Sequence, residues 1–276
     1  MLDKNTLDLI DRALAEDIGP GDVTARLLPA SLSGSADLLA KSDLVLAGAE
    51  VFAETFRRVD PAIEVHLDVP DGTRVKNRTV IGRVKGPARS ILTGERTALN
   101  FVQRLSGIAT FTARCAEAVA GTKTQIIDTR KTTPGLRALE KHAVRMGGGM
   151  NHRFGLFDGV LIKDNHIAAL GGVTEAIRRA RQEAHHLLRV ECEVTNLSEL
   201  EEALAAKADV ILLDNMTTAM MAEAVEKTAG RALLEASGNM TLARLPEVAK
   251  TGVDFISLGA LTHTITSADL SLEWKR

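Results

Sequence analysis

The chain has 276 residues, enough for one large α/β domain or two smaller ones with real cores. Its 34 basic and 36 acidic residues give a formal charge of −2, which argues against nucleic acid or a membrane surface as the main partner. Seven Phe, one Trp and no Tyr leave few aromatic rings to stack on single-stranded nucleic acid.

The cysteines and the N-terminus predict the compartment. Cys115 and Cys192 lie far apart in the sequence and form no metal motif, which fits a reducing environment. Residues 1–19 have the pattern of an amphipathic helix that contains acids, unlike a signal peptide. Since no apolar stretch of about 18 residues occurs, we expect no transmembrane helix. We therefore expect a cytoplasmic protein.

The first hundred residues have an α+β pattern. A helix is predicted over 6–17, and it ends at the Gly-Pro-Gly run 19–21. Alternating runs then predict the strands of an antiparallel sheet, at 35–41, 44–47, 63–69 and 79–84.

A long helix is predicted over 95–120, with an interruption near Ser106–Gly107. After it, short apolar runs alternate with helical segments, which is typical of a parallel sheet. The predicted strands are 124–127, 160–162, 188–194, 210–213, 232–234 and 255–258. The predicted helices are 136–146, 174–186, 198–207, 217–228 and 242–250.

Each predicted strand of this second part ends at a polar residue or a glycine, namely Asp128, Lys163, Glu193, Asp214, Ser237 and Gly259. The C-terminal strand ends of a (β/α) barrel face one mouth, where active sites are built. An open Rossmann sheet is the alternative, but no GxGxxG follows a strand and the polar residues are not confined to one switch point. The pattern favours a barrel, and six strands rather than eight predict an incomplete one.

Positive charge is concentrated between Asp128 and Ile167. The segment holds seven cations and three histidines, namely Arg130, Lys131, Arg137, Lys141, Arg145, Arg153, Lys163, His142, His152 and His166. In a chain of charge −2, this concentration predicts a ligand with several negative charges.

The run Thr129–Lys131 directly follows a predicted strand. An arginine can hold a carboxylate through two parallel hydrogen bonds, and a lysine is a compact charge for phosphate. A solvated basic turn is an equally open interpretation. For Asn151–Arg153, the preceding glycines 147–149 allow close approach to a ligand or form a helix end, and both can hold together.

Glu193 and Asp214 end consecutive strands. Two carboxylates at a barrel mouth can bind Mg²⁺, directly or through water, or act as a general acid and base. The alternative is that they pair with Lys163 and Lys131 and do no chemistry.

Small residues follow the last two predicted strands. Backbone N–H groups in such loops form the usual phosphate site of a barrel. The residues concerned are Ser237, Gly238, Asn239 and Gly259, and His263 lies close by in sequence.

The segment Asp128–Ile167 closely resembles the signature of the quinolinate phosphoribosyltransferase family. Further blocks resemble that family in the family's order: AEDIGPGDVT (15–24), GERTALNF (94–101), VECEV (190–194), ILLDNM (211–216), EASGN (235–239) and ISLGALTH (256–263). The resemblance covers essentially the whole chain. His142 and Met146 depart from the Tyr and Cys that are common in relatives, and we expect little effect on chemistry.

The resemblance implies an N-terminal α/β sandwich domain over 1–106, to which the tail 265–276 returns, and an incomplete α/β barrel over 107–264. The implied reaction joins quinolinate and phosphoribosyl pyrophosphate (PRPP), with Mg²⁺, to give nicotinate mononucleotide, pyrophosphate and CO₂. It belongs to NAD biosynthesis. The implied assembly is a homodimer or a hexamer in which Arg96 completes the site of a neighbouring subunit.

The resemblance also divides the site residues among three tasks. Quinolinate binding is implied for Arg130, His152, Arg153 and Lys163, with Arg96 from the partner. Contacts with PRPP and metal are implied for Lys131, Glu193 and Asp214. The 5′-phosphate region is implied for Ser237, Gly238, Asn239, Gly259 and His263.

Two alternative functions remain at this point. One is the paralogous protein of molybdenum uptake operons, which shares the fold and many motifs. The other is a non-catalytic protein that binds a phosphorylated ligand. The intact charged set at the strand ends favours the enzyme over both.

Overall fold

The computed structural model describes residues 2–275 and divides the chain into two compact units. The first contains residues 1–113, 132–148 and 261–276, and the second contains 114–131 and 149–260. The division expected from the family resemblance, at residues 106 and 264, stays a prediction. No helix among the described residues is both long and apolar enough to cross a bilayer.

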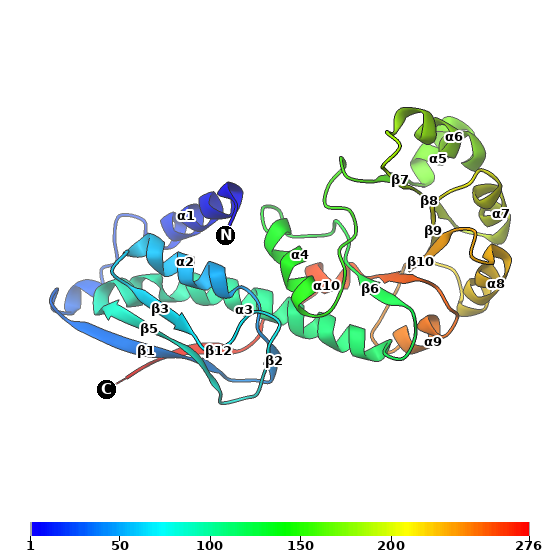
Figure 1. Ribbon diagram of the computed structural model, residues 1–276. Helices are drawn as coiled ribbons and strands as arrows, with labels where there is room; N and C mark the ends of the chain where they lie inside the picture. The colour runs from blue at the N-terminus through cyan, green and yellow to red at the C-terminus, as the bar shows by residue number, and fades with distance from the viewer. Residues whose placement is uncertain (1, 276) are drawn as a thin grey trace. The chain divides into compact units, whose positions relative to one another are not determined.

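The first unit is built on an antiparallel sheet with strand order β12-β1-β5-β3 (Figure 1). Its strands and the separate β2–β4 pair are β1 (Ser33–Ala40), β2 (Leu44–Val45), β3 (Glu64–Leu67), β4 (Arg74–Val75), β5 (Val80–Pro87) and β12 (Leu270–Trp274). Its helical elements are α1 (Lys4–Ile18), a 3₁₀ turn (Ala25–Leu27), α2 (Ala49–Val59) and α4 (Arg137–Met146). The predicted antiparallel sheet is confirmed, and the C-terminal strand lies in it.

A single apolar cluster joins this sheet to its helices. Phe52 and Phe56 of α2 are fully buried with ring centroids 5.2 Å apart, and they pack with Leu38 of β1 and Ile81 of β5. The rings lie four residues apart, on one face of the helix. The sheet presents its inward positions to the same cluster, which gives the sandwich that was expected.

Helix α3 (Ala88–Ala118) is continuous, so the predicted interruption near Ser106–Gly107 is wrong. A Cβ atom at position 107 would lie 2.3 Å from the carbonyl oxygen of Thr266. The glycine therefore allows the C-terminal segment to approach the helix closely, and it does not break the helix.

The second unit contains a parallel sheet with strand order β6-β11-β10-β9-β8-β7. The strands are β6 (Gln125–Ile127), β7 (Val160–Ile162), β8 (Val190–Val194), β9 (Val210–Asp214), β10 (Leu233–Ser237) and β11 (Phe255–Ser257). The helices are α5 (Asp164–Leu170), α6 (Val173–Glu183), α7 (Leu197–Ala205), α8 (Thr218–Thr228) and α9 (Leu245–Ala249). Helix α10 (Ala260–His263) follows, and its residues 261–263 belong to the first unit. Figure 1 shows α5 to α9 arrayed along the outside of the curved sheet.

The sheet is an incomplete barrel, as predicted, because β6 and β7 are its two edges. The extended segment after α4 lies beside β6. Met150 forms an isolated parallel bridge to Ile127, and its backbone N–H donates to the carbonyl of Ile126 at 2.8 Å. This segment carries the Asn-His-Arg motif alongside the first strand.

Strand alternation assigns the side chains of the sheet to two faces. Cys192 and Leu234 are buried positions that flank the acidic positions of β8 and β10. Glu191 and Glu193 of β8 lie two residues apart, as do Glu235 and Ser237 of β10, so each pair shares the inner face. The inner face therefore carries polar groups in its middle layer as well as at its mouth.

Candidate active site

A cavity of about 610 Å³ lies at the C-terminal ends of the parallel strands. It is lined by eleven of the predicted site residues, namely Thr129, Arg130, Lys131, His152, Arg153, Lys163, Glu193, Asp214, Ser237, Gly238 and Asn239. Residues from separate strand ends therefore line one continuous cavity. Cations come from the segments after β6 and β7, and carboxylates come from β8 and β9.

Three predicted residues are not among those that line this cavity. Arg96 is exposed on α3, and His263 is exposed at the end of α10, both in the first compact unit. Gly259 follows β11 in the second unit. Their assignments stay predictions.

Asp128 fixes the Asn-His-Arg segment at the end of β6. Its carboxylate is fully buried and accepts hydrogen bonds from Asn151 Nδ2 at 2.6 Å and from the backbone N–H of His152 at 2.9 Å. Two charge-assisted bonds from one buried carboxylate hold the segment in register with the strand. The sequence pattern alone identifies Asp128 only as a strand end.

The glycines before this segment serve the helix end. Gly148 has φ of 85° at the end of α4, a conformation that few other residues adopt. A Cβ on Gly147 would lie 2.4 Å from the carbonyl oxygen of Ala109 in the same unit. The structure therefore supports the helix-end interpretation of this run, and the compatible interpretation of close approach to a ligand stays a prediction.

Arg153 carries the strongest sign of an anionic ligand. Its Nη1 donates to the carbonyl of Gly159 at 3.0 Å, whereas its buried Nε has no hydrogen-bond partner among the described residues. Burial, and then the charge of Arg130, lower the pKa of this guanidinium. An unpaired buried donor costs about 1–3 kcal/mol, and a carboxylate in the cavity would remove that cost.

Glu193 and Asp214 form the acidic wall of the cavity, where burial and their mutual repulsion disfavour the charged form of Glu193. Burial raises the pKa of Glu193; Asp214 adds to the rise, and Lys163 opposes it. Lys163 Nζ lies 3.7 Å from Glu193 Oε2, so one of the alternative ion pairs is present, although the lysine side chain is 51% exposed. A cation that bridged these two carboxylates and a substrate phosphate would stabilise the carboxylates.

The loops after β9 and β10 hold each other in place. Asn239 Nδ2 donates to Asn215 Oδ1 at 3.0 Å, and Asn215 Nδ2 donates to Asp214 Oδ2 at 2.7 Å. Gly238 has φ of 86°, and a Cβ there would lie 2.2 Å from Asn215 Oδ1. Only glycine meets both demands, so the loop geometry depends on this position.

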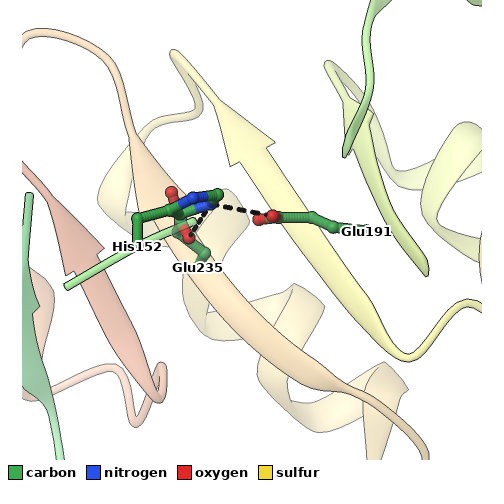
Figure 2. Close-up of side chains that lie close together, drawn as sticks. All are labelled: His152, Glu191 and Glu235. Atoms are coloured by element: carbon green, nitrogen blue, oxygen red, sulfur yellow. Dashed lines mark hydrogen bonds and ion pairs between the residues drawn. The ribbon is translucent and has the colours of Figure 1, made fainter. Parts of the chain in front are cut away.

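Sequence reasoning missed two acidic residues in the middle layer of the barrel, Glu191 and Glu235. His152 Nε2 lies 2.9 Å from Glu191 Oε2 and 3.6 Å from Glu235 Oε2 (Figure 2). The two glutamates are 7% and 2% exposed. Burial, and then the charge of Glu191, raise the pKa of Glu235 well above its usual range.

Period-two alternation could have found these two glutamates. Each lies two residues before a predicted strand-end residue and on the same face of its strand. With His152 they place three potential metal-ligand atoms within 4.8 Å of one another. The described residues therefore offer two sites to weigh for a cation, this buried cluster and the Glu193–Asp214 wall.

Comparisons with known proteins agree with this architecture. Residues 108–273 match the family model described as quinolinate phosphoribosyl transferase, C-terminal domain, and residues 22–106 match the N-terminal domain model of the same family. A probable nicotinate-nucleotide pyrophosphorylase [carboxylating] of Bacillus subtilis is 46% identical over 265 residues, which cover 96% of this chain and 92% of that protein.

A plant relative and a solved structure extend the likeness. Quinolinate phosphoribosyltransferase [decarboxylating] 1b of Nicotiana tabacum is 42% identical and covers 96% of this chain and 81% of its own length. The nicotinate-nucleotide pyrophosphorylase structure from Francisella tularensis has a TM-score of 0.97 and 42% identity, and it covers 100% of this chain and 98% of that one. The chain therefore belongs to the quinolinate phosphoribosyltransferase family.

Proposed function

We propose that the chain transfers the phosphoribosyl group of PRPP to quinolinate and releases CO₂. The products are nicotinate mononucleotide, pyrophosphate and CO₂, and the reaction is a step of NAD biosynthesis. The observation that carries the proposal is the buried Nε of Arg153, which has no partner within residues 2–275 and lies near Arg130 in a cavity with an acidic opposite wall. A dicarboxylate fits the first wall, and a phosphorylated sugar with a cation fits the second.

The basic wall orients quinolinate in this proposal. Arg130 and Arg153 hold the carboxylates with paired hydrogen bonds, and Lys163 and His152 complete that wall. The pyridine nitrogen then attacks the anomeric carbon of the ribose as the bond to pyrophosphate breaks. The protein contributes mainly by positioning the two substrates.

The acidic wall and the small-residue loops receive PRPP. Lys131 stabilises the charge that develops on the leaving pyrophosphate, and a carboxylate nearby stabilises an oxocarbenium-like ribose. The loop Ser237–Asn239 binds the 5′-phosphate through backbone N–H groups. Gly259 and His263 are assigned to the same phosphate by their place in the family motif.

Decarboxylation follows from the positive charge that ribosyl transfer places on the ring nitrogen. Once the ring nitrogen is quaternary, its positive charge stabilises the electron pair that the breaking C–C bond leaves on the adjacent ring carbon, so CO₂ leaves and an ylide forms. A proton then replaces CO₂ on the ring carbon. No covalent nucleophile is needed, so mass spectrometry of the enzyme during turnover should show no ribosyl adduct, and a trapped adduct would contradict this scheme.

Glu193 and Asp214 are the residues that would hold Mg²⁺. The fit rests on two acidic side chains at neighbouring strand ends, whose mutual repulsion contributes to the raised pKa of Glu193. A bound Mg²⁺ would supply charge neutralisation to the pyrophosphate, directly or through water. Removal of the metal with a chelator should stop turnover, and added Mg²⁺ should restore it.

The decisive experiment is a steady-state assay with quinolinate, PRPP and Mg²⁺. Nicotinate mononucleotide is measured by chromatography, with reactions that lack either substrate as controls. Product that depends on both substrates supports the proposal. No product above background from folded protein would exclude it and leave the molybdenum-operon paralogue or a binding protein, which growth rescue of a strain lacking the enzyme would test separately.

A homodimer or a hexamer completes the proposed site. Arg96 is exposed on α3, as a residue that serves a neighbouring subunit must be. Arg96→Ala should lower activity roughly 10²-fold, the scale expected for loss of a charged partner. Mixed with an inactive Lys131→Ala protein, it should regain part of the activity, because some mixed sites contain both native residues.

Absence of recovery in assemblies shown to be mixed would contradict the sharing of Arg96.

The cytoplasm stays the proposed compartment. It is supported by Cys115 and Cys192, which are both buried and free.

A further inference from the structure

Both ring nitrogens of His152 are engaged within the protein. Nδ1 accepts a hydrogen bond from the backbone N–H of Arg153 at 2.7 Å, and Nε2 lies 2.9 Å from Glu191 Oε2. A backbone nitrogen can only donate, so Nδ1 carries no proton. The neutral ring therefore has its proton on Nε2 and donates it to Glu191.

The carboxyl groups behind the histidine continue this chain of hydrogen bonds. Glu191 Oε1 is buried and accepts no hydrogen bond from a protein donor among residues 2–275. Glu235 lies beside it, and the hydroxyl of Ser257 donates to Glu235. Two adjacent buried carboxyl groups hold one proton between them more cheaply than two charges.

A neutral Glu235 gives hydrogen-bond partners to all four side chains, which are Ser257, Glu235, Glu191 and His152. It accepts from Ser257 and donates its own proton to Glu191, which then accepts from both Glu235 and His152. The raised pKa of Glu235 agrees with this assignment. Every donor in this row of hydrogen bonds then has an acceptor, and the direction of each bond is fixed.

We propose that Glu191 and Glu235 are positioning residues that set the tautomer of His152 and, through Nδ1, the backbone of Arg153 at the quinolinate site. The proposal rests on the proposed function only for the identity of the ligand. His152 then contributes by the place of its ring and by its bond to Arg153, and it does not donate a ring N–H to a substrate carboxylate.

A metal ion is the competing occupant of the cluster. The three side chains offer ligand atoms within 4.8 Å, but a metal would need the Nε2 lone pair. In the tautomer that accepts a hydrogen bond from Arg153 at Nδ1, that nitrogen carries the proton. Calorimetry with Zn²⁺ decides between the two: specific binding that is lost when Glu235 is replaced by leucine would overturn the hydrogen-bond assignment.

Kinetics of matched variants test the chain of bonds. Glu235→Leu should raise the quinolinate KM roughly tenfold and leave the PRPP KM within about twofold, since a buried hydrogen bond to the quinolinate wall is lost. Glu235→Gln should recover most of that loss, because its amide donates to Glu191 and accepts from Ser257. Glu201→Ala, at an exposed residue paired with Lys227, serves as the control with unchanged constants.

The proposal fails if Glu235→Gln is as impaired as Glu235→Leu, because the negative charge would then matter more than the donor. It also fails if the KM values of both substrates rise equally in folded protein. Thermal melting of each variant shows whether folding has been retained.

Nitrogen NMR of the unaltered protein tests the tautomer without any variant of the glutamates. With labelled histidine, and with His152→Gln to identify the signal, Nδ1 should have the shift of an unprotonated nitrogen and Nε2 that of a protonated one at neutral pH. A doubly protonated ring, or a proton on Nδ1, would overturn the proposal. This result is independent of turnover, so a failure of the proposed function would be recognised separately.

Discussion

Glu140 and Glu235 are glutamates of nearly equal burial, one in each compact unit, and their surroundings differ. Glu140 is fully buried; its Oε1 accepts from Arg104 Nε at 2.9 Å and Nη2 at 2.7 Å, and its Oε2 accepts from the backbone N–H of Thr133 at 3.0 Å. Glu235 instead lies beside Glu191, a second acid. Burial alone thus does not distinguish a structural carboxylate from one at a site, whereas the partners do.

Arg153 belongs with Glu235 in this contrast. Arg104 makes four hydrogen bonds from its Nε and Nη2 to protein acceptors within its unit, including one to Thr133 Oγ1 at 2.6 Å. Arg153 instead keeps a buried Nε without a partner among the described residues. A saturated ion pair stabilises the fold, and an unsaturated cation in a cavity keeps its capacity for a ligand. The two regions should therefore respond differently to mutation.

The largest effect on stability should come from Glu140→Ala. It leaves Arg104 with its charge partner removed, so the free energy of unfolding should fall by about 3–5 kcal/mol. Urea denaturation measures the change, and Glu140→Gln should lose less because its amide oxygen keeps one of the two acceptors. A loss below about 1 kcal/mol would erase the distinction between the two regions.

Arg153→Ala should reverse the pattern. The kcat/KM for quinolinate should fall roughly 10²-fold, because a charged partner of the carboxylate is lost, while the melting temperature stays the same or rises. Arg178→Ala, which removes an exposed arginine paired with Glu175 on α6, should change neither. An unchanged kcat/KM in the first variant would exclude Arg153 from the site.

Gly238→Ala should cost stability and substrate binding together. Its positive φ and the 2.2 Å approach to Asn215 Oδ1 predict a loss of about 1–3 kcal/mol in unfolding free energy and a higher PRPP KM. Gly230→Ala is the matched control, because its φ is also positive at 76° but nothing lies within 4 Å of its added Cβ. If both variants behave alike, the close contact has no role beyond backbone strain.

The smallest effect should come from Glu193→Gln. The pKa of Glu193 is higher in the folded protein than its ordinary value of 4.5. The ionised carboxylate therefore destabilises the fold at pH values above the folded-state pKa, and this destabilisation is absent below pH 4.5. The variant should gain about 0.5–1 kcal/mol at neutral pH, lose that gain on acidification, and lose activity. Melting curves measured at several pH values check this prediction, and a variant that is less stable at neutral pH would contradict it.

The strand ends were predictable because they depend on local pattern. Apolar runs that stop at a polar residue located β6 to β11 within a few residues, and parallel strands must bring those ends together. Helix α2 was missed although Val51, Phe52 and Phe56 have helical spacing. Its N-terminus is capped by Asp71, more than twenty residues along the chain, so no local stop signal marks it.

Other features needed tertiary information. Helix α5 has no buried residue and hence no apolar stripe to detect. The middle layer could have been found by alternation in β8 and β10, but the direction of the bonds at His152 depends on contacts between distant segments. Arg96 and His263 show the opposite limit, since motif position predicts a role that the described cavity does not test.

The order of the parallel strands has a consequence for how the site assembles. Neighbours from β7 to β11 follow one another along the chain, so each pairing closes over a single helical crossover connection. Strand β6 pairs with the last strand, Gln125 with Phe255, which is the longest closure in the sheet. Because Arg130 and Lys131 follow β6, their wall of the mouth forms only when the final strand is in place, and folding should be slowest at the step that creates the substrate pocket.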